Sequence, residues 1–77
     1  MQLVLSPRAI KNLKSIPAKD RAAIITKLEI YAETGMGDVI KLVGYPYFRL
    51  RHGDWRAILE MTGEIVVLRI LHRREAY

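Results

Sequence analysis

The chain has 77 residues, a formal net charge of +5 and no cysteine. A chain of this length forms one small domain, residues 1–77, and without cysteine it has neither disulfides nor thiolate metal sites to stabilise it. No apolar run reaches the roughly 18 residues of a membrane-spanning helix. We therefore expect a soluble, cytoplasmic protein that does not enter a membrane.

The positive charge is divided unevenly along the chain. All five lysines precede residue 42, whereas six of the eight arginines follow it. Lysine is a strongly hydrated point charge, while the planar guanidinium of arginine binds a phosphate through two hydrogen bonds. This division predicts a solvated helical layer and a sheet that faces a polyanion such as nucleic acid. The alternative is that the charge arose by chance and serves solubility alone.

The first half of the chain has the pattern of a strand followed by two helices. Residues 2–5 form a short apolar run, and Ser6 and Pro7 then supply a hydroxyl N-cap and a proline at the first helical position. Pro17 ends this helix and opens a second one, which Gly35 terminates. The predicted apolar stripes are Ile10, Leu13 and Ile16 in the first helix, and Ala22, Ile24, Ile25, Leu28, Tyr31 and Ala32 in the second.

The last third, residues 47–77, has the pattern of a three-stranded antiparallel meander. Turn signals at residues 52–54 and 61–64 separate three runs rich in β-branched and aromatic side chains. Side chains alternate between the two faces of a strand. In the first strand the predicted faces are Phe48 with Leu50, and Arg49 with Arg51. In the third they are Val66, Leu68 and Ile70 against Val67, Arg69 and Leu71.

A short segment joins the helices to the meander. Residues 34–38 are expected to form a loop, and residues 39–43 a brief extended segment that Gly44, Tyr45 and Pro46 close. The element order is then β-α-α-β-β-β. This order predicts an α+β fold in which two N-terminal helices pack on one face of a mainly antiparallel sheet.

The residues that could carry chemistry are concentrated in the meander. The chain has only two histidines, with no metal-ligand spacing, and no phosphate-binding glycine loop or nucleophile motif, so we expect no metal or cofactor. The candidate cluster is Arg49, Arg51, Arg56, Arg69, His72, Arg73, Arg74 and Tyr77. From spacing alone the chain is a basic-faced α+β domain that binds a polyanion.

Cleavage of a phosphodiester requires a group that helps deprotonate the nucleophile, cations that stabilise the phosphorane, and a donor for the leaving oxygen. Arginines suit the second role, and His72 or Tyr77 could supply the others, because arginine hardly ever loses its proton. Other interpretations stay open. Arg69 could pair with Glu60 or Glu64 across the sheet, His72 could be structural, and Arg74 could be solvated.

Three stretches together carry a family resemblance. They are Leu42-Val43-Gly44, then Phe48-Arg49-Leu50-Arg51-His52-Gly53-Asp54-Trp55-Arg56-Ala57-Ile58-Leu59-Glu60, and finally Ile65-Val66-Val67-Leu68-Arg69-Ile70-Leu71-His72-Arg73-Arg74-Glu75-Ala76-Tyr77. The sequence resembles the RelE/ParE toxin superfamily, and the similarity covers essentially the whole chain.

The resemblance implies a type II toxin that a cognate antitoxin protein holds inactive. RelE-like members are ribosome-dependent endonucleases that enter the A site, contact 16S rRNA and cut mRNA through the 2′-hydroxyl without a metal. Operator DNA would be bound only through the antitoxin complex. The implied roles are phosphate binding for Arg49, Arg51 and Arg56, transition-state stabilisation for Arg73, stacking or proton transfer for Tyr77, and RNA binding for Arg69 and Arg74. The best-known member has lysines on the first meander strand where this chain has Arg49, so His72 is the candidate for its missing base.

The same resemblance leaves two other functions open. ParE-like members inhibit DNA gyrase by binding, without chemistry on RNA, and fold does not decide between these functions. An inert nucleic-acid-binding remnant is the third. The ending from His72 to Tyr77 favours the ribonuclease, because gyrase-directed relatives tend not to keep the tyrosine.

Overall fold

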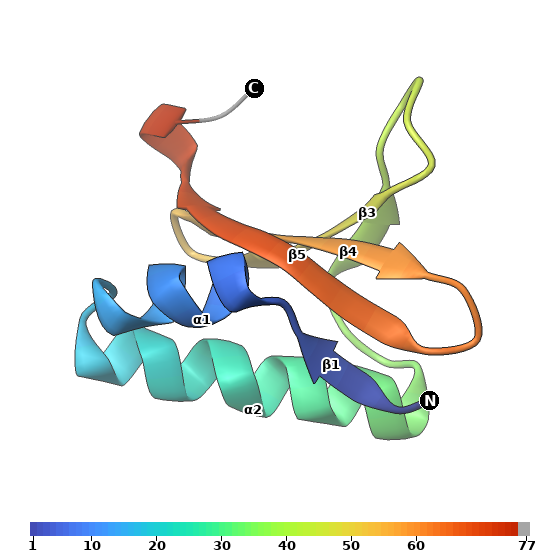
Figure 1. Ribbon diagram of the computed structural model, residues 1–77, viewed down its shortest axis with the longest axis horizontal. Coiled ribbons are helices and arrows are strands. Elements are labelled where there is room, and N and C mark those ends of the chain that lie inside the picture. Colours follow the sequence, from blue (N-terminus) through green and yellow to red (C-terminus); the bar gives the residue numbers. More distant parts are fainter. Residues whose placement is uncertain (76–77) are drawn as a thin grey trace.

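The computed structural model describes residues 1–75 and has two layers, a pair of helices and a five-stranded sheet (Figure 1). Both helices lie on one face of the sheet, so the expected α+β architecture is confirmed. Neither helix is long and apolar enough to cross a membrane. The elements in chain order are β1 (Leu3–Leu5), α1 (Pro7–Lys14), α2 (Ala18–Thr34), β2 (Val39–Lys41), β3 (Phe48–His52), β4 (Trp55–Met61), β5 (Ile65–His72) and the 3-10 turn η1 (Arg73–Glu75).

The sheet has one strand more than the β-α-α-β-β-β order predicts. Its strand order is β1-β5-β4-β3-β2, with β1 parallel to β5 and all other neighbours antiparallel. The additional strand is β2, which pairs with β3 at the sheet edge. It lies within residues 39–43, the brief extended segment predicted from the sequence, and its pairing with β3 makes that segment a strand of the sheet.

The helix ends follow the predicted capping residues. Pro7 takes the first position of α1, and the N–H of Ala9 donates to the Ser6 hydroxyl oxygen at 3.1 Å. At the end of α2, Gly35 has a φ of 74° and donates its N–H to the Tyr31 carbonyl oxygen at 2.8 Å. This left-handed conformation is strained for a residue with a Cβ, which is why glycine ends the helix here.

Most of the predicted apolar stripe of each helix is confirmed, because Leu13, Ile16, Ile24, Leu28 and Ala32 are buried, and Ile25 and Tyr31 pack against the core. In α1 the buried residues are Ala9 and Leu13, whereas Ile10 is 44% exposed. In α2, Ala22 lies on the exposed side because it precedes the buried Ile24 by two residues, which is more than half a turn. The predicted stripes were therefore wrong at Ile10 and Ala22, and they left out the buried Ala9.

A β-bulge in β5 interrupts the alternation of its side chains. Val67 pairs with Leu59 and Arg69 pairs with Ile58, so Leu68 has no partner on β4. An unpaired residue of this kind shifts the phase of the strand by one position. The predicted grouping of Val67 with Arg69 is therefore wrong, because Val67 lies in the core and Arg69 points away from it.

Helix α1 binds the polar groups that the bulge leaves free. The Ser6 hydroxyl donates to the Leu68 carbonyl oxygen at 2.8 Å, while Asn12 Oδ1 accepts from the Ile70 N–H at 2.9 Å. A buried backbone group without a partner would be destabilising. Two polar side chains on one helix therefore hold the irregular part of β5 in place.

The core lies between the helices and the sheet. It consists of Ala9, Leu13, Ile16, Ile24, Leu28, Ala32, Leu50, Ala57, Leu59, Ile65, Val67 and Ile70. Burying a large apolar side chain contributes about 1.5–3 kcal/mol. This one-sided core carries most of the folding stability, and the opposite face of the sheet is left for other uses.

Candidate functional site

The sheet face opposite the helices carries four arginines. Cross-strand pairing forms one row of Arg49, Ile58 and Arg69, and a second row of Arg51, Arg56 and Leu71. Their strand neighbours Leu50, Ala57 and Ile70 lie in the core, so these six side chains point the other way. We call these six residues the open face. The expectation that these arginines share one region of the sheet is confirmed.

Arg49 and Arg69 lie on either side of Ile58. The Nε atom of Arg49 is buried and has no hydrogen-bond partner among the described residues. No carboxylate within residues 1–75 lies within 4 Å of the Arg69 guanidinium, so neither Glu60 nor Glu64 neutralises it. Two guanidinium groups that form no ion pair within residues 1–75 thus lie on this face, where they can bind an anion.

The other two arginines of the open face have neighbouring partners. Arg51 Nε lies 2.8 Å from Asp38 Oδ2, and both side chains are about half exposed. Arg56 Nη1 donates to the carbonyl oxygens of Gly53, at 2.7 Å, and Trp55, at 3.0 Å. Exposed ion pairs are weak, so a phosphate can compete with Asp38 for Arg51. Arg56 is held more firmly, over the turn between β3 and β4.

A group of charged residues surrounds this turn at the rim of the open face. Asp54 Oδ1 lies 3.6 Å from Arg73 Nε, and Asp54 Oδ2 lies 3.9 Å from His72 Nε2. The N–H of Arg73 donates to the Asp54 carbonyl oxygen at 2.7 Å. The turn therefore brings Arg56 and Arg73 to the same end of the sheet, although they lie far apart in the sequence.

His72 lies on the helix side of the sheet rather than with the arginines of the open face. It pairs with Trp55, and the two rings meet edge to face with centroids 5.0 Å apart. The alternation of β5 explains this position, because His72 follows the core residue Ile70 by two. The N–H of Arg74 donates to His72 Nδ1 at 3.2 Å, so in the neutral ring the proton is on Nε2.

The two predicted site residues nearest the C-terminus are Arg74 and Tyr77. Arg74 lies in η1 with an exposed side chain that makes no ion pair within residues 1–75. Tyr77 lies outside the described residues.

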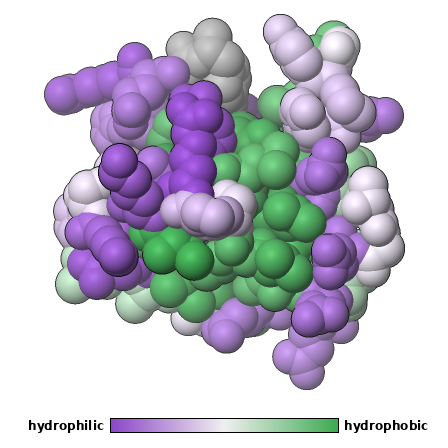
Figure 2. All heavy atoms as spheres, viewed as in Figure 1, coloured by the Kyte–Doolittle hydropathy of each residue, from purple (hydrophilic) through white to green (hydrophobic). Residues whose placement is uncertain are grey.

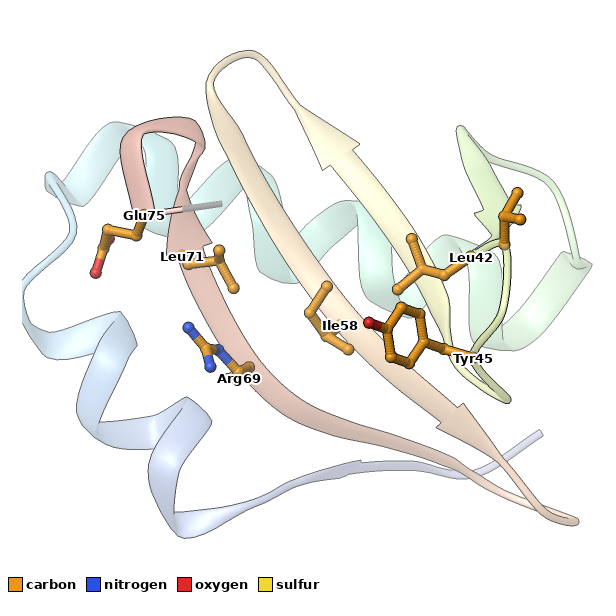
Figure 3. A pocket seen from close by; sticks show the side chains of 7 residues that line it. Leu42, Tyr45, Ile58, Arg69, Leu71 and Glu75 are labelled. Atoms are coloured by element: carbon orange, nitrogen blue, oxygen red, sulfur yellow. The ribbon is translucent and has the colours of Figure 1, made fainter. Parts of the chain in front are cut away.

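A pocket of about 490 Å³ opens on the open face (Figure 3). Its lining residues are Leu42, Val43, Tyr45, Ile58, Arg69, Leu71 and Glu75. The loop between β2 and β3 forms one wall and η1 the other, and Ile58 and Leu71 lie between them. In Figure 2 hydrophobic atoms are visible at the base of the hollow between this loop, at the upper right, and the end of β5. The site thus combines an apolar hollow with a cationic border.

The loop residues of this pocket were not among the predicted site residues. Val43 is 95% exposed and Tyr45 is 63% exposed, although both are large and apolar or aromatic. Apolar side chains clustered in an exposed loop often mark a binding site. The run of Leu42, Val43 and Tyr45 around Gly44 carried that signal in the sequence.

The part of the chain that the structure describes contains no cluster of possible metal ligands. No three histidine, aspartate or glutamate side chains among residues 1–75 converge where a metal ion could bind. The groups that the open face offers are guanidinium N–H donors, which bind and stabilise anions.

Known proteins match this chain over almost its full length. The family model for the ParE toxin of type II toxin–antitoxin systems, parDE, matches residues 3–77. Toxin RelE3 of Methanocaldococcus jannaschii is 29% identical over 84 residues, an alignment that covers 100% of this chain and 96% of that protein.

Solved structures agree with this relationship. A chain of the RelB–RelE antitoxin–toxin complex from Methanococcus jannaschii superposes with a TM-score of 0.83 at 29% identity, covering 96% of this chain and 94% of that one. The archaeal RelE–RelB complex from Pyrococcus horikoshii OT3 gives 0.79 at 25% identity, with 97% of both chains covered. The RelBE2 complex from Mycobacterium tuberculosis, at 19% identity and a TM-score of 0.72, shares the fold. The chain therefore belongs to the ParE toxin family and, within the RelE/ParE superfamily, to its RelE-like branch, and it is a toxin of a type II toxin–antitoxin system.

Proposed function

We propose that this toxin is an endoribonuclease that enters the ribosomal A site and cuts mRNA there. The observation that carries the proposal is the row of Arg49, Ile58 and Arg69, in which two guanidinium groups without an ion pair among the described residues flank an apolar side chain. Guanidinium groups bind phosphate at two points, and an apolar surface between them suits a base. An mRNA strand carries a phosphate and a base in every nucleotide, so it could occupy both parts of this row.

The proposed reaction uses the 2′-hydroxyl of the mRNA as its nucleophile. The 2′-oxygen attacks the adjacent phosphorus, the bond to the 5′-oxygen breaks, and a cyclic phosphate and a free 5′-hydroxyl result. Arg49, Arg51 and Arg56 would hold the phosphate, and Arg73 would stabilise the negative charge of the transition state. Arg69 and Arg74 would bind the flanking backbone, and Tyr77 would stack on a base or transfer a proton.

His72 fits one of the two proton transfers better than the other. With Nδ1 accepting the Arg74 N–H, a neutral His72 can only donate, from Nε2. A histidine acts as a general acid only from its imidazolium form, which carries a proton on each ring nitrogen. We therefore assign the imidazolium of His72 the role of general acid toward the leaving 5′-oxygen, at the rim beside Arg73, rather than the role of base. The substrate would reach this ring over the end of β5.

The toxin would have two kinds of partner, an antitoxin that inhibits it and the ribosome with its mRNA. The structures that resemble it are complexes of RelE with RelB, which supports a cognate antitoxin that covers the toxin and holds it inactive. The active toxin would bind the ribosome through 16S rRNA and mRNA in the A site, in the cytoplasm. Operator DNA would be bound only through the antitoxin complex, and the reaction would need no cofactor.

Primer extension tests the activity directly. A defined mRNA is incubated with the toxin, with and without programmed 70S ribosomes. We expect cuts in register with the A site only when ribosomes are present. Arg73→Ala should abolish them, whereas Arg8→Ala, which changes an exposed arginine of α1, should not. Intact mRNA in both reactions, from folded and toxic protein, would refute the proposal.

A second candidate function is inhibition of DNA gyrase. The match to the ParE toxin family model favours it. In that case the open face would bind the enzyme without cutting RNA, and supercoiling by purified gyrase would fall as toxin is added while mRNA stays intact. Tyr77→Ala separates the two functions, because it should impair a ribonuclease strongly and a gyrase inhibitor little.

A further inference from the structure

The bulge in β5 determines on which face of the sheet Arg69 lies. Val67 pairs with Leu59 in the core, and both side chains are 0% exposed. In an uninterrupted antiparallel strand, Arg69 would follow Val67 onto the same face and would pair with Ala57. Its guanidinium would then enter the core, where a charge without a partner is strongly unfavourable. The extra residue Leu68 shifts the alternation, so Arg69 lies on the open face instead.

Ser6, which precedes helix α1, binds the backbone of β5 just before Arg69. Its N–H donates to the Val67 carbonyl oxygen at 3.0 Å, and its hydroxyl donates to the Leu68 carbonyl oxygen at 2.8 Å. The same hydroxyl accepts the Ala9 N–H at 3.1 Å as the N-cap of the helix. A carboxylate would cap the helix equally well, but it could not donate to Leu68. A hydroxyl therefore suits both contacts.

Asn12, in the second turn of α1, binds the backbone of β5 just after Arg69. Its Oδ1 accepts the Ile70 N–H at 2.9 Å. The side chain of Ile70 is 3% exposed and belongs to the core, so this contact lies where the regular alternation resumes. The backbone on both sides of Arg69 is thus bound to the helical layer, whereas its side chain points away from that layer.

We infer that Ser6 and Asn12 are positioning residues for the RNA-binding site. Through the bulge they keep the Arg69 guanidinium on the open face, where it binds a phosphate of the RNA strand. They act from the opposite layer and do not contact the strand themselves. The inference deepens the proposed function and rests on it, because it takes RNA as the ligand of the open face.

The salt dependence of RNA binding tests this role. Fluorescence anisotropy measures the affinity of the purified toxin for a single-stranded RNA at several salt concentrations. Each phosphate contact on a single strand contributes about 0.7 to the slope of log affinity against log salt concentration. Arg69→Ala should reduce the magnitude of this slope by about 0.7 and weaken binding by about tenfold. Asn12→Ala should reduce the same slope and weaken binding by about threefold, because Arg69 is then held less well.

Ser6 offers a second test with a conservative partner. Ser6→Ala removes the donor to Leu68 and should reduce the slope in the same way as Asn12→Ala. Ser6→Thr keeps the hydroxyl and should retain the wild-type slope. Ile24→Val, which removes one methyl group from a core residue of α2, is the control for lost stability and should also leave the slope unchanged. All variants are compared at a temperature at which circular dichroism shows them folded.

A double-mutant cycle shows whether the effect passes through Arg69. In Arg69→Ala toxin, adding Asn12→Ala should not change the slope further, since the side chain that Asn12 positions is already absent. Equal effects of Asn12→Ala with and without Arg69 would overturn the inference. An affinity that Arg69→Ala leaves unchanged would also overturn it, because Arg69 would then bind no phosphate.

These measurements also separate the inference from the proposed function, because the slope is measured on RNA alone and cutting is measured on ribosomes. If Asn12→Ala lowers the slope only when Arg69 is present, but wild-type toxin cuts no mRNA, the proposed reaction is wrong and the positioning role stands. If mRNA is cut in the A site, but neither Asn12→Ala nor Ser6→Ala changes the slope, the positioning role is wrong and the proposed function stands.

Discussion

The two faces of one sheet are used in opposite ways. On the helix side, Leu50, Ala57 and Leu59 are at most 2% exposed and are packed against two helices. On the open face, the residues next to Leu50 and Ala57 in sequence are three arginines and Ile58, and Arg49 Nε has no hydrogen-bond partner among residues 1–75. Stability is thus concentrated on one face, which lets the other keep charges that would be unfavourable in a core. Predictions that damage one face and spare the other test this division.

The largest effect on stability is expected from Leu59→Ala. Leu59 is 0% exposed at the centre of the helix side, so the substitution should lower the free energy of unfolding by about 2–5 kcal/mol. Urea denaturation measures this change. Ile40→Ala, at an edge position that is 48% exposed, is the control and should change it by less than about 0.5 kcal/mol. Equal losses in both variants would contradict a one-sided core.

Arg49→Ala on the open face is expected to lower the activity and to leave the stability almost unchanged. Cutting of mRNA on ribosomes should fall by about 100-fold or more, since a donor to the phosphate is lost. The free energy of unfolding should change by less than about 0.5 kcal/mol, because Arg49 Nε has no hydrogen bond to residues 1–75 that the substitution could remove. Primer extension and urea denaturation give the two values, with Arg8→Ala as the control. A stability loss as large as that of Leu59→Ala would show that Arg49 is structural.

Asn12→Ala tests the contact that joins helix α1 to the bulged part of β5. It leaves the Ile70 N–H without an acceptor and should lower the free energy of unfolding by about 1–3 kcal/mol. Amide hydrogen exchange at Ile70 should become faster. Asn12→Asp keeps an acceptor oxygen and should retain most of the stability. If both variants lose the same amount, the hydrogen bond does not hold the bulge.

The smallest effect is expected from Asp38→Asn, at the edge of the open face. It weakens the pair with Arg51, whose members are half exposed, and should cost less than about 1 kcal/mol. This loss should shrink further at high salt, which screens the pair. We also expect slightly stronger RNA binding, because Arg51 is released for phosphate. Denaturation at low and high salt, with RNA binding by fluorescence anisotropy, provides the check, and weaker binding would argue that Asp38 orients Arg51 for its ligand.

Local signals predicted much of the fold and the cationic side of the site. Ser6 with Pro7 marked the start of α1 and Gly35 the end of α2, since capping depends on residues close in sequence. The alternation of Leu50 with Arg49 and Arg51 likewise placed these arginines on the face away from the core. A period of two residues is a property of any strand and needs no knowledge of its neighbours.

The sequence alone therefore determined the two layers, the helix ends and the arginine-bearing strands. Only the tertiary structure decided which residues meet across the sheet. The bulge at Leu68 depends on Ser6 and Asn12, which lie more than 50 residues away, and no local pattern reports such a partner. The same holds for the position of His72 against Trp55 and for the pocket between Tyr45 and Glu75. Contacts between distant segments arise from packing, and packing depends on the whole chain at once.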